Sequence, residues 1–431
     1  MFIIFIVGNG SDTVGFGNDL ELRKTLRKGL EYAATGMVGI PIATGLGLMA
    51  YEKIRKTFRP LNKKFPVAPP QAVQVHHNET TVFTFGRDLY LAMLADIAKA
   101  KHTIYFESFI WKGDHTGKLF KTALTDAVNR GVEVYVIYDG FANLVVPRKF
   151  FQFDPRIKVL RFPWVHTQRF VGPIRSSGRD HRKIIVVDDE VGYVGGYNIG
   201  DLYTDKWRDT HLRLTGPAVW ELRNAFVDFW NRWRTPDLPI LEVKGADRWL
   251  PTLRAARNSP AELRFPIRNI YLDALERATS HVLITQAYFI PDHDIREALM
   301  RAAARGVDVR ILVPERSNHV VADWLARGHY AGLLRGGVRI FLYQGAMIHA
   351  KTATVDSRWS TIGTANIDRL SLTGNYEINM EIISAPMART LDEIFAMDLT
   401  QAHELTLAEW DDRSVFARIG ERFVAPLGPL L

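Results

Sequence analysis

The chain has 431 residues, of which 47% are hydrophobic and 24% charged, and it contains no cysteine. This composition excludes a globally disordered chain, a collagen-like chain, a disulfide-stapled protein and a cysteine-ligated zinc site. The formal net charge of +8 favours an anionic partner, which is nucleic acid, a membrane or a phosphate-bearing substrate, although an ordinary soluble basic enzyme shows the same excess.

The first predicted element is an uncharged stretch that runs from Tyr32 to Tyr51. A helix of that length spans about 30 Å, which is the thickness of the bilayer hydrocarbon. Basic residues flank it and are more numerous after it, which predicts a cell-membrane protein whose main body lies on the cytoplasmic face. The glycines and Pro41 within the stretch leave two alternatives open, an interfacial helix and a buried helix of a soluble protein. Residues 58–72 are rich in proline and predict a linker, with the folded body starting near Val73.

Two long stretches of the remaining chain share one pattern. Each reads as a helix, an apolar strand, a second helix and a glycine-valine step into another strand, and Gly131 and Gly306 occupy matching places. Helices alternating with short apolar runs predict an α/β fold with largely buried, mostly parallel strands. The repeat divides the chain into an N-terminal membrane-associated segment and linker at 1–65 and two tandem domains, 66–250 and 251–431.

Each copy carries the motif His-x-Lys-x4-Asp. The motif residues are His181, Lys183 and Asp188 in the first copy and His349, Lys351 and Asp356 in the second. Further pairs keep equal offsets from the motif histidine: Gly195 and Gly363 at 14, Asn198 and Asn366 at 17, and Asp209 and Glu377 at 28. One duplicated site explains these equal spacings better than chance does.

The run after each motif histidine is apolar and β-branched, which predicts a strand. A period of two then places the histidine and the lysine on the same strand face. The odd offset of Asp188 and Asp356 places them on the other face or beyond the strand end. They complete the motif and so enter the predicted catalytic set, but this offset favours a structural role. Asp209 and Glu377 are the predicted partners of the imidazole Nδ1 atoms, and would fix ring tautomer and orientation.

Two imidazoles and two ammonium groups suit the cleavage of a phosphodiester without a metal or any other cofactor. One neutral histidine attacks phosphorus and forms a phosphohistidine, while the other donates a proton to the leaving alkoxide. Lys183 and Lys351 would bind the non-bridging oxygens and stabilise charge in the transition state. These physical grounds do not choose which of His181 and His349 is the nucleophile.

With these residues in place, the sequence resembles the phospholipase D superfamily and, within it, the bacterial cardiolipin synthases. The stretches that carry the resemblance are FESFIW, HRKIIVVDDEVGYVGGYNIGDLY, WRDTHLRLTGPAV and HAKTATVDSRWSTIGTANIDRLSLTGNYEIN. The resemblance implies two phospholipase D-like domains that meet at one pseudo-twofold active site. It also implies transfer of a phosphatidyl group between two phosphatidylglycerol molecules with release of glycerol, with His181 as nucleophile and His349 as acid.

The turns after the second strand of each motif supply the predicted contacts to the substrate phosphate, because glycine permits close backbone approach and asparagine offers an amide. These residues are Gly196, Asn198, Asn366 and Ser371. The family usually carries an Arg-Ser pair after the second asparagine, and here Leu370 precedes Ser371. We therefore expect a local change in how the site is lined.

The expected partners are an anionic phospholipid membrane and phosphatidylglycerol, and no nucleic acid is expected. The alternative is a phospholipase D-type hydrolase or a nucleic-acid phosphodiesterase of the same superfamily. The net charge and a stretch at 141–170 that interleaves aromatic and basic residues favour that alternative. The same stretch also suits a bilayer interface, or ordinary packing between the two halves.

Overall fold

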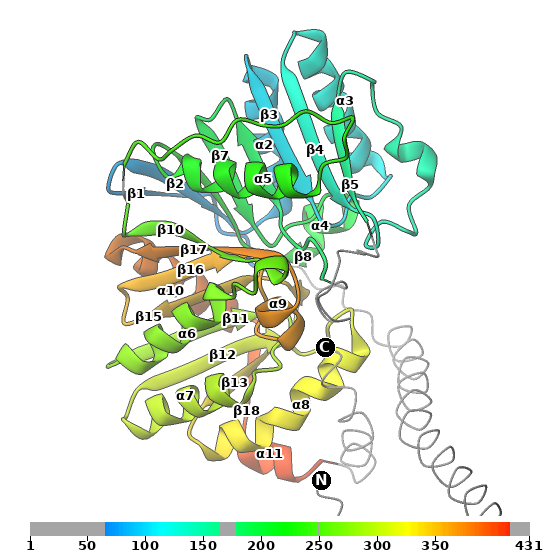
Figure 1. Ribbon diagram of the computed structural model, residues 1–431. Helices are drawn as coiled ribbons and strands as arrows, with labels where there is room; N and C mark the ends of the chain where they lie inside the picture. Colours follow the sequence, from blue (N-terminus) through cyan, green and yellow to red (C-terminus); the bar gives the residue numbers. More distant parts are fainter. Residues whose placement is uncertain (1–64, 164–177, 249, 414–431) are drawn as a thin grey trace, which may run out of the picture.

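Two eight-stranded sheets, one from each half of the chain, lie one above the other (Figure 1). The structure is a computed structural model that describes residues 65–163, 178–248 and 250–413. The predicted membrane segment at Tyr32 to Tyr51 lies outside these residues. Within the three described ranges, no helix combines the length and the apolar character needed to cross a membrane.

The first sheet has the strand order β1-β2-β9-β7-β6-β3-β4-β5. Helices α2 (Gly86–Lys99) and α3 (His115–Asn129) cover one face, and α5 (Val219–Trp233) covers the other. The short elements α4 (Asp201–Asp205), β8 (Trp207–Arg208) and η1 (Arg148–Phe151) lie in its connections. The strands are β1 (Gln71–Val75), β2 (Asn78–Phe83), β3 (Thr103–Ser108), β4 (Glu133–Asp139), β5 (Lys158–Phe162), β6 (Ile184–Val187), β7 (Val191–Gly195) and β9 (His211–Thr215).

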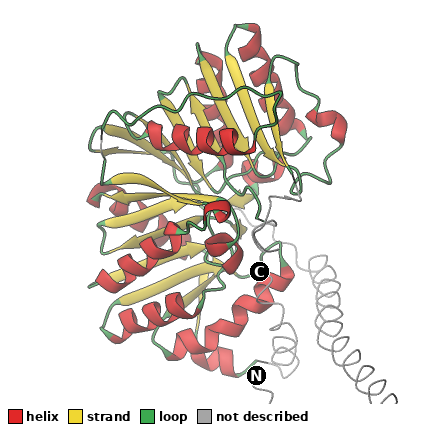
Figure 2. Cartoon of the chain, in the orientation of Figure 1, coloured by secondary structure: helices red, strands yellow, loops and turns green. Residues whose placement is uncertain are grey.

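The second sheet has the order β10-β17-β16-β15-β11-β12-β13-β18, in which the first seven strands repeat the run from β2 to β5, while the eighth strand lies at the opposite end of the sheet from β1. Helices α6 (Pro266–Arg277), α7 (His293–Ala304) and α8 (Val320–Arg335) pack on one face, while α10 (Ala385–Leu399) packs on the other (Figure 2). The short elements are η2 (Pro260–Glu262), β14 (Met347–Ile348), α9 (Arg369–Thr373) and α11 (Leu407–Asp411). The strands are β10 (Leu253–Asn258), β11 (His281–Gln286), β12 (Asp308–Pro314), β13 (Arg339–Tyr343), β15 (Lys351–Val355), β16 (Trp359–Gly363), β17 (Glu377–Ile383) and β18 (Ala402–Leu405).

The repeat and the α/β class are as the sequence predicts, but the expectation of mostly parallel strands is wrong. Parallel pairing joins β3, β4 and β5 in the first sheet and β11, β12 and β13 in the second. All other neighbours within these two sheets pair antiparallel. Tight connections, such as the turn between β6 and β7, can join only antiparallel strands, whereas a parallel pair needs a long crossover.

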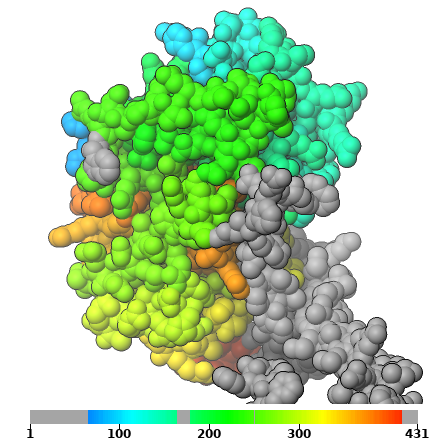
Figure 3. All heavy atoms as spheres, in the orientation of Figure 1, coloured from blue at the N-terminus to red at the C-terminus, as the bar shows by residue number. Residues whose placement is uncertain are grey.

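The two halves share one apolar core. Side chains of α5 and of the first sheet pack in one cluster with side chains of β17 and α10 from the second half. In the space-filling view of Figure 3, atoms of the first half lie directly against atoms of the second half on the left side of the face shown. The body also begins earlier than Val73, because β1 starts at Gln71 and Phe65 is buried against Phe341 and Tyr343. The predicted linker at 58–72 therefore overlaps the folded body from Phe65 onward.

Polar contacts also join the halves near the centre of the molecule. Strand β8 of the first half pairs in parallel with β14 of the second, so that Arg208 lies opposite Ile348. The buried Arg208 guanidinium donates to both carboxylate oxygens of Asp398, at 2.9 and 2.6 Å. A buried charge without a partner destabilises a fold. Arg208 and Asp398 therefore stabilise this arrangement of the two halves only while both side chains are present.

Candidate active site

Each motif histidine lies directly before a central strand. His181 precedes β6, and His349 precedes β15, whose first residue is Lys351. The strand that the sequence predicts after each histidine is therefore confirmed. Both histidines and both motif lysines are buried at the junction of the two halves.

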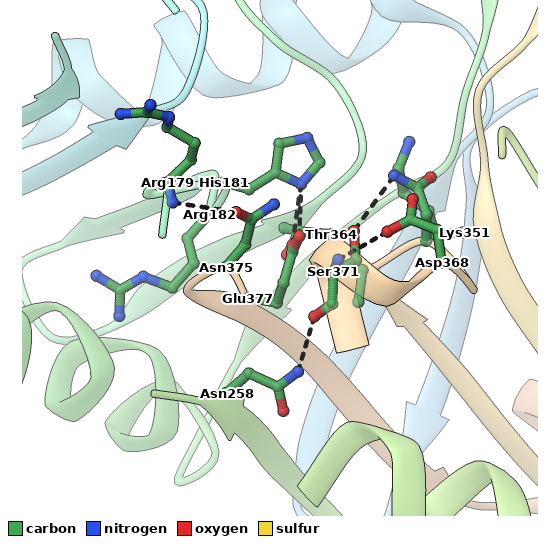
Figure 4. A network of polar contacts seen from close by, with 12 residues as sticks. Arg179, His181, Arg182, Asn258, Lys351, Thr364, Asp368, Ser371, Asn375 and Glu377 are labelled. Atoms are coloured by element: carbon green, nitrogen blue, oxygen red, sulfur yellow. Dashed lines mark hydrogen bonds and ion pairs between the residues drawn. The ribbon is translucent and has the colours of Figure 1, made fainter. Parts of the chain in front are cut away.

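The two histidines exchange carboxylate partners between the halves. Nδ1 of His181 lies 2.9 and 3.0 Å from the two carboxylate oxygens of Glu377, in the second half (Figure 4). Nδ1 of His349 lies 2.6 Å from Oδ2 of Asp209, in the first half. A carboxylate that accepts from Nδ1–H leaves Nε2 of a neutral ring with its lone pair free for chemistry. The structure thus pairs both predicted acids with the motif histidines, and each acid serves the histidine of the other half.

Backbone pairing explains this exchange. The amide of His181 donates to the carbonyl of Tyr376 at 3.0 Å, and Tyr376 directly precedes Glu377. The amide of His349 donates to the carbonyl of Arg208 at 2.6 Å, directly before Asp209. Each histidine is therefore fixed to the segment that carries its acid, in a pseudo-twofold arrangement that forms one site from both halves.

The motif lysines lie against the histidines. Nζ of Lys183 donates to the His181 carbonyl at 2.5 Å. Nζ of Lys351 donates to the His349 carbonyl and lies 2.8 Å from Nδ1 and 3.1 Å from Nε2 of that ring. Burial lowers the pKa of Lys183 to about 7 and that of Lys351 to about 8. A bound phosphate anion would favour the charged form of both and would raise these values.

Both imidazoles are neutral at neutral pH. Burial lowers the pKa of His181, against the opposing effect of Glu377. Burial and the neighbouring Lys351 ammonium lower the pKa of His349 to about 3, against the opposing effect of Asp209. A neutral imidazole is the form that can act as a nucleophile, and an anionic substrate would favour protonation of the second ring.

Aromatic rings line both histidines, and the sequence did not point to them. The Phe109 ring lies edge-on to His181 with centroids 4.5 Å apart. Trp207 lies 5.0 Å and Tyr288 6.2 Å from the His349 ring, between centroids. Apolar walls keep water from the imidazoles and strengthen electrostatic interactions within the site. Phe109 and Trp207 fall in the stretches FESFIW and WRD, but only the folded chain brings them to the histidines.

Gly196 and Thr364 occupy matching places in the two halves, and each lies against the carboxylate that pairs with a motif histidine. A Cβ atom at Gly196 would lie 2.1 Å from Oδ1 of Asp209, so only glycine allows this close approach. At the matching place in the second half, the Thr364 hydroxyl donates to Oε2 of Glu377 at 2.6 Å (Figure 4). Gly196 therefore has a role in placing Asp209, and its contact with the substrate phosphate stays a prediction.

The two predicted asparagines differ. Oδ1 of Asn198 accepts from the Ile110 amide at 3.1 Å. This hydrogen bond fixes the loop after β3 and gives Asn198 a structural role. Asn366 has its Nδ2 3.5 Å from Oγ of Ser371, and its buried Oδ1 has no hydrogen-bond partner within the described ranges. The Ser371 amide donates to Oδ1 of Asp368 at 2.7 Å, which caps α9 (Figure 4). Asn366 and Ser371 therefore remain the predicted phosphate contacts.

Asp368 and His211 are buried ionisable groups near the site that the sequence did not assign. Burial raises the pKa of Asp368 to about 7 and lowers that of His211 to about 3. Asp368 directly precedes α9 and caps its N-terminus. His211 is the first residue of β9 and lies two residues after Asp209. Near pH 7, Asp368 is therefore about half protonated and His211 is neutral.

Asp188 and Asp356 do not belong with the reacting groups. The Asp188 carboxylate accepts from three successive backbone amides, at Lys101, His102 and Thr103, each at 2.8 Å. The Asp356 carboxylate does the same for residues 279–281 at 2.9, 2.8 and 3.0 Å. Each lies just past the end of its strand, remote from the histidine that precedes the strand. The catalytic assignment is corrected: each aspartate clamps the start of the neighbouring strand.

Comparison with known proteins agrees with this geometry. The family model described as "Cardiolipin synthase, PLD-like domain" matches residues 93–230 and 271–399. The chain is similar to the major cardiolipin synthase ClsA of Bacillus subtilis, with 34% identity over 380 residues that cover 84% of this chain and 77% of the relative. It is also similar to a cardiolipin synthase of Staphylococcus aureus, with 32% identity over 374 residues, or 82% of this chain and 74% of the relative. Among solved structures, a phosphatidylserine synthase from Haemophilus influenzae shares the fold, with a TM-score of 0.65, 15% identity and coverage of 88% and 98%.

Proposed function

Because the chain belongs to the cardiolipin synthase family with phospholipase D-like domains, we propose that it joins two phosphatidylglycerol molecules into cardiolipin and releases glycerol. The observation that carries this proposal is the exchanged pairing of His181 with Glu377 and of His349 with Asp209. It gives one site two oriented imidazoles, which is what a two-step transfer through a covalent intermediate needs.

In the first step, Nε2 of neutral His181 attacks the phosphorus of one phosphatidylglycerol. The bond between phosphorus and the oxygen of the head-group glycerol breaks, and protonated His349 gives its proton to that oxygen. Glycerol leaves, and the phosphatidyl group remains on His181. Asp209, at 2.6 Å from Nδ1, stabilises the imidazolium form of His349 that this step requires.

In the second step, neutral His349 takes the proton from a head-group hydroxyl of the second phosphatidylglycerol. That oxygen attacks phosphorus, the bond to His181 breaks, and cardiolipin forms while both histidines return to their starting states. Lys183 and Lys351 bind the non-bridging oxygens in both steps, with Asn366 and Ser371 as further phosphate contacts. The charge and proton transfers thus need no metal or other cofactor.

The proposed setting is the cytoplasmic face of a cell membrane that holds anionic phospholipid. The uncharged stretch at 32–51 and its basic flanks support this setting. An active site at a lipid surface meets acceptor head groups at high local concentration, which favours transfer over hydrolysis. Nucleic acid is not expected as a substrate.

The test is product analysis with the purified full chain and vesicles of phosphatidylglycerol. We expect cardiolipin and glycerol in equal amounts, and neither from His181→Ala or His349→Ala. His77→Ala, at an exposed position of the first half, is the matched control and should keep full activity. Phosphatidic acid as the main product would replace the proposal with a hydrolase, and cut DNA without new lipid would replace it with a nucleic-acid phosphodiesterase.

A further inference from the structure

The loop that follows β4 exposes three apolar side chains in a row of five residues. The exposed fraction is 46% for Phe141, 56% for Leu144 and 81% for Val145. Residues 140–153 contain no acidic residue, and they include the exposed basic residues Arg148 and Lys149, three and four positions after Val145. Clustered apolar side chains on a surface mark a contact with a partner or a membrane more often than single ones do.

This loop has a defined conformation. Oδ1 of Asp139 accepts from the amides of Phe141 and Ala142 at 2.8 Å each. Asn143 is buried, and its amide donates to the carbonyls of Asp139 and Phe109 at 2.8 Å each, while its Oδ1 accepts from the Trp111 amide at 2.8 Å. These hydrogen bonds fix the backbone so that the side chains of Phe141, Leu144 and Val145 point outward and stay exposed to water.

The loop lies beside the first motif histidine. Phe109, which Asn143 holds through its carbonyl, is the residue whose ring contacts His181. On the other side, the Arg179 guanidinium lies 4.0 Å from the centre of the Phe141 ring.

The same surface continues into the second half. The Arg179 amide donates to Asn375 at 3.0 Å, just after α9 (Figure 4). Helix α9 exposes Leu370 together with Arg369. We call Phe141, Leu144, Val145 and Leu370 the apolar rim.

The corresponding loop of the second half is polar. It follows β12, and residues 315–319 have the sequence Glu-Arg-Ser-Asn-His. Asn318 accepts from the Tyr288 hydroxyl at 2.6 Å, and Ser317 donates through its amide to Asp323 at 2.9 Å. The fold thus does not require an apolar loop at this place, so the apolar character of the first loop serves something outside the fold.

We propose that the apolar rim inserts into the interfacial layer of a bilayer that contains anionic lipid, with Arg148 and Lys149 at its head groups. Aliphatic side chains gain free energy in that layer, and adjacent basic residues gain from the negative surface potential. Leu144 and Val145 have no ring on which a nucleobase could stack, so the rim fits lipid better than single-stranded nucleic acid. That the lipid beside His181 is the phosphatidyl donor rests on the proposed function.

The absence of cysteine makes a direct test available. Val145→Cys in the full chain accepts one environment-sensitive nitrobenzoxadiazole label. Ile240→Cys is the matched control, because Ile240 is 71% exposed and lies in the connection between α5 and β10. With vesicles of phosphatidylglycerol, phosphatidylcholine and a lipid that carries a doxyl quencher on its acyl chain, we expect quenching about threefold stronger at position 145 than at position 240.

Equal quenching at the two positions, or none at position 145 in vesicle-bound protein, would overturn the proposal. A second contrary result is a blue shift of the label's fluorescence emission at position 145 that grows with protein concentration in the absence of lipid. This result would overturn the proposal, because the rim would then bind a second copy of the chain. Quenching at position 145 in protein that forms no cardiolipin would support the rim while contradicting the proposed function. The two proposals can therefore fail separately.

A second readout uses enzyme rates. Leu144→Ser combined with Val145→Ser should lower the ratio of the rate on phosphatidylglycerol vesicles to the rate on a short-chain soluble phosphodiester about tenfold. Ile240→Ser combined with Val243→Ser changes two comparably exposed side chains far along the chain from the motifs and should leave this ratio unchanged. An unchanged ratio in the rim variant would contradict insertion.

Discussion

The two halves of this molecule carry the same motif, yet neither half contains a complete catalytic pair. His181 takes its carboxylate from the second half and His349 takes its own from the first. The two domains cannot work as independent enzymes. If the halves were separated, each would hold a motif histidine without its carboxylate and a carboxylate without its histidine. The duplication thus yields one site, and its two histidines can take different roles in one reaction.

The halves also differ around this shared core. Where the first half has Gly196 against Asp209, the second has Thr364, which donates to Glu377. The loop beside His181 is apolar, and the loop that corresponds to it in the second half is polar. These differences suit the two unlike tasks that we propose, in which the side of His181 faces lipid chains and holds the intermediate while the side of His349 moves protons.

The largest expected effect comes from removing either histidine. His181→Ala and His349→Ala should each lower kcat by about 10⁴-fold or more, and the double variant should be no worse than either single one. The reason is that both act in one reaction, so their losses do not add. Half of the activity remaining in each single variant would show two independent sites.

The exchanged acids should come next. Glu377→Gln and Asp209→Asn keep the size of the side chain but remove the charge, and each should lower kcat by about 10²- to 10⁴-fold, because the partner imidazole loses its preferred tautomer. Thr364→Val removes only the hydroxyl that donates to Glu377 and should cost about tenfold or less. Steady-state rates on a soluble phosphodiester measure all three. Equal losses in Thr364→Val and Glu377→Gln would contradict the tautomer explanation.

The junction between the halves can be weakened by a substitution that leaves the two histidines, the two lysines and the two paired acids in place. Arg208→Met leaves Asp398 as an unpaired buried carboxylate, and should lower the free energy of unfolding by about 3–5 kcal/mol. Arg335→Met removes the exposed pair with Asp411 and is the matched control, with an expected loss of about 0–1 kcal/mol. Urea unfolding followed by circular dichroism compares them. Similar losses in both variants would show that the buried pair does not hold the halves together.

The pKa values of the two motif lysines predict how kcat/KM depends on pH on the alkaline side. The pKa of Lys183 is about 7 and that of Lys351 about 8, so both lose their protons as the pH rises through this range. Since only the ammonium form binds phosphate oxygens well, kcat/KM should fall by up to about tenfold per pH unit between pH 7 and 8, and by up to about a hundredfold per pH unit above pH 8, where both lysines lose their protons. On the acid side, kcat/KM should hold below pH 6.5, because burial lowers the pKa of the attacking His181 and keeps it neutral, while falling pH favours the protonated form of His349 that donates the proton. Lys351→Arg, which keeps its charge, should shift the alkaline limb upward, and an unmoved limb would remove Lys351 as its origin.

The smallest expected effect is that of a chelator. Two lysines and two histidines already supply charge stabilisation and proton transfer, so activity in EDTA should stay within about twofold of the untreated value. Detergent micelles in place of vesicles separate effects of metal on the lipid from effects on the enzyme. A complete loss in micelles that one metal ion restores would overturn the proposed mechanism.

The sequence predicted the parts of this site that depend on local spacing. The repeat, the strand after each motif histidine and the two acids at equal offsets all follow from periodicities along the chain. The position of Asp188 and Asp356 beyond the strand also follows from the odd offset, and the structure supports the clamp over the catalytic assignment.

The parts that the sequence missed depend on which distant segments pair. The exchange of acids arises because residues 376 and 208 pair with the opposite histidine segments. The mainly antiparallel sheet likewise follows from strand neighbours far apart in sequence. Phe109 and Trp207 have no spacing that links them to the histidines, since only tertiary packing brings them together.

The central claim is that both halves form one site in which His181 carries the phosphatidyl group and His349 transfers protons. Intact-protein mass spectrometry of His349→Ala after incubation with a phosphatidyl p-nitrophenyl ester, whose leaving group needs no proton from His349, tests it most directly, with peptide mapping of the adduct. We predict one phosphatidyl group per chain, on His181, and none in the His181→Ala variant. An adduct on another residue, or an adduct that persists in His181→Ala, would contradict the account.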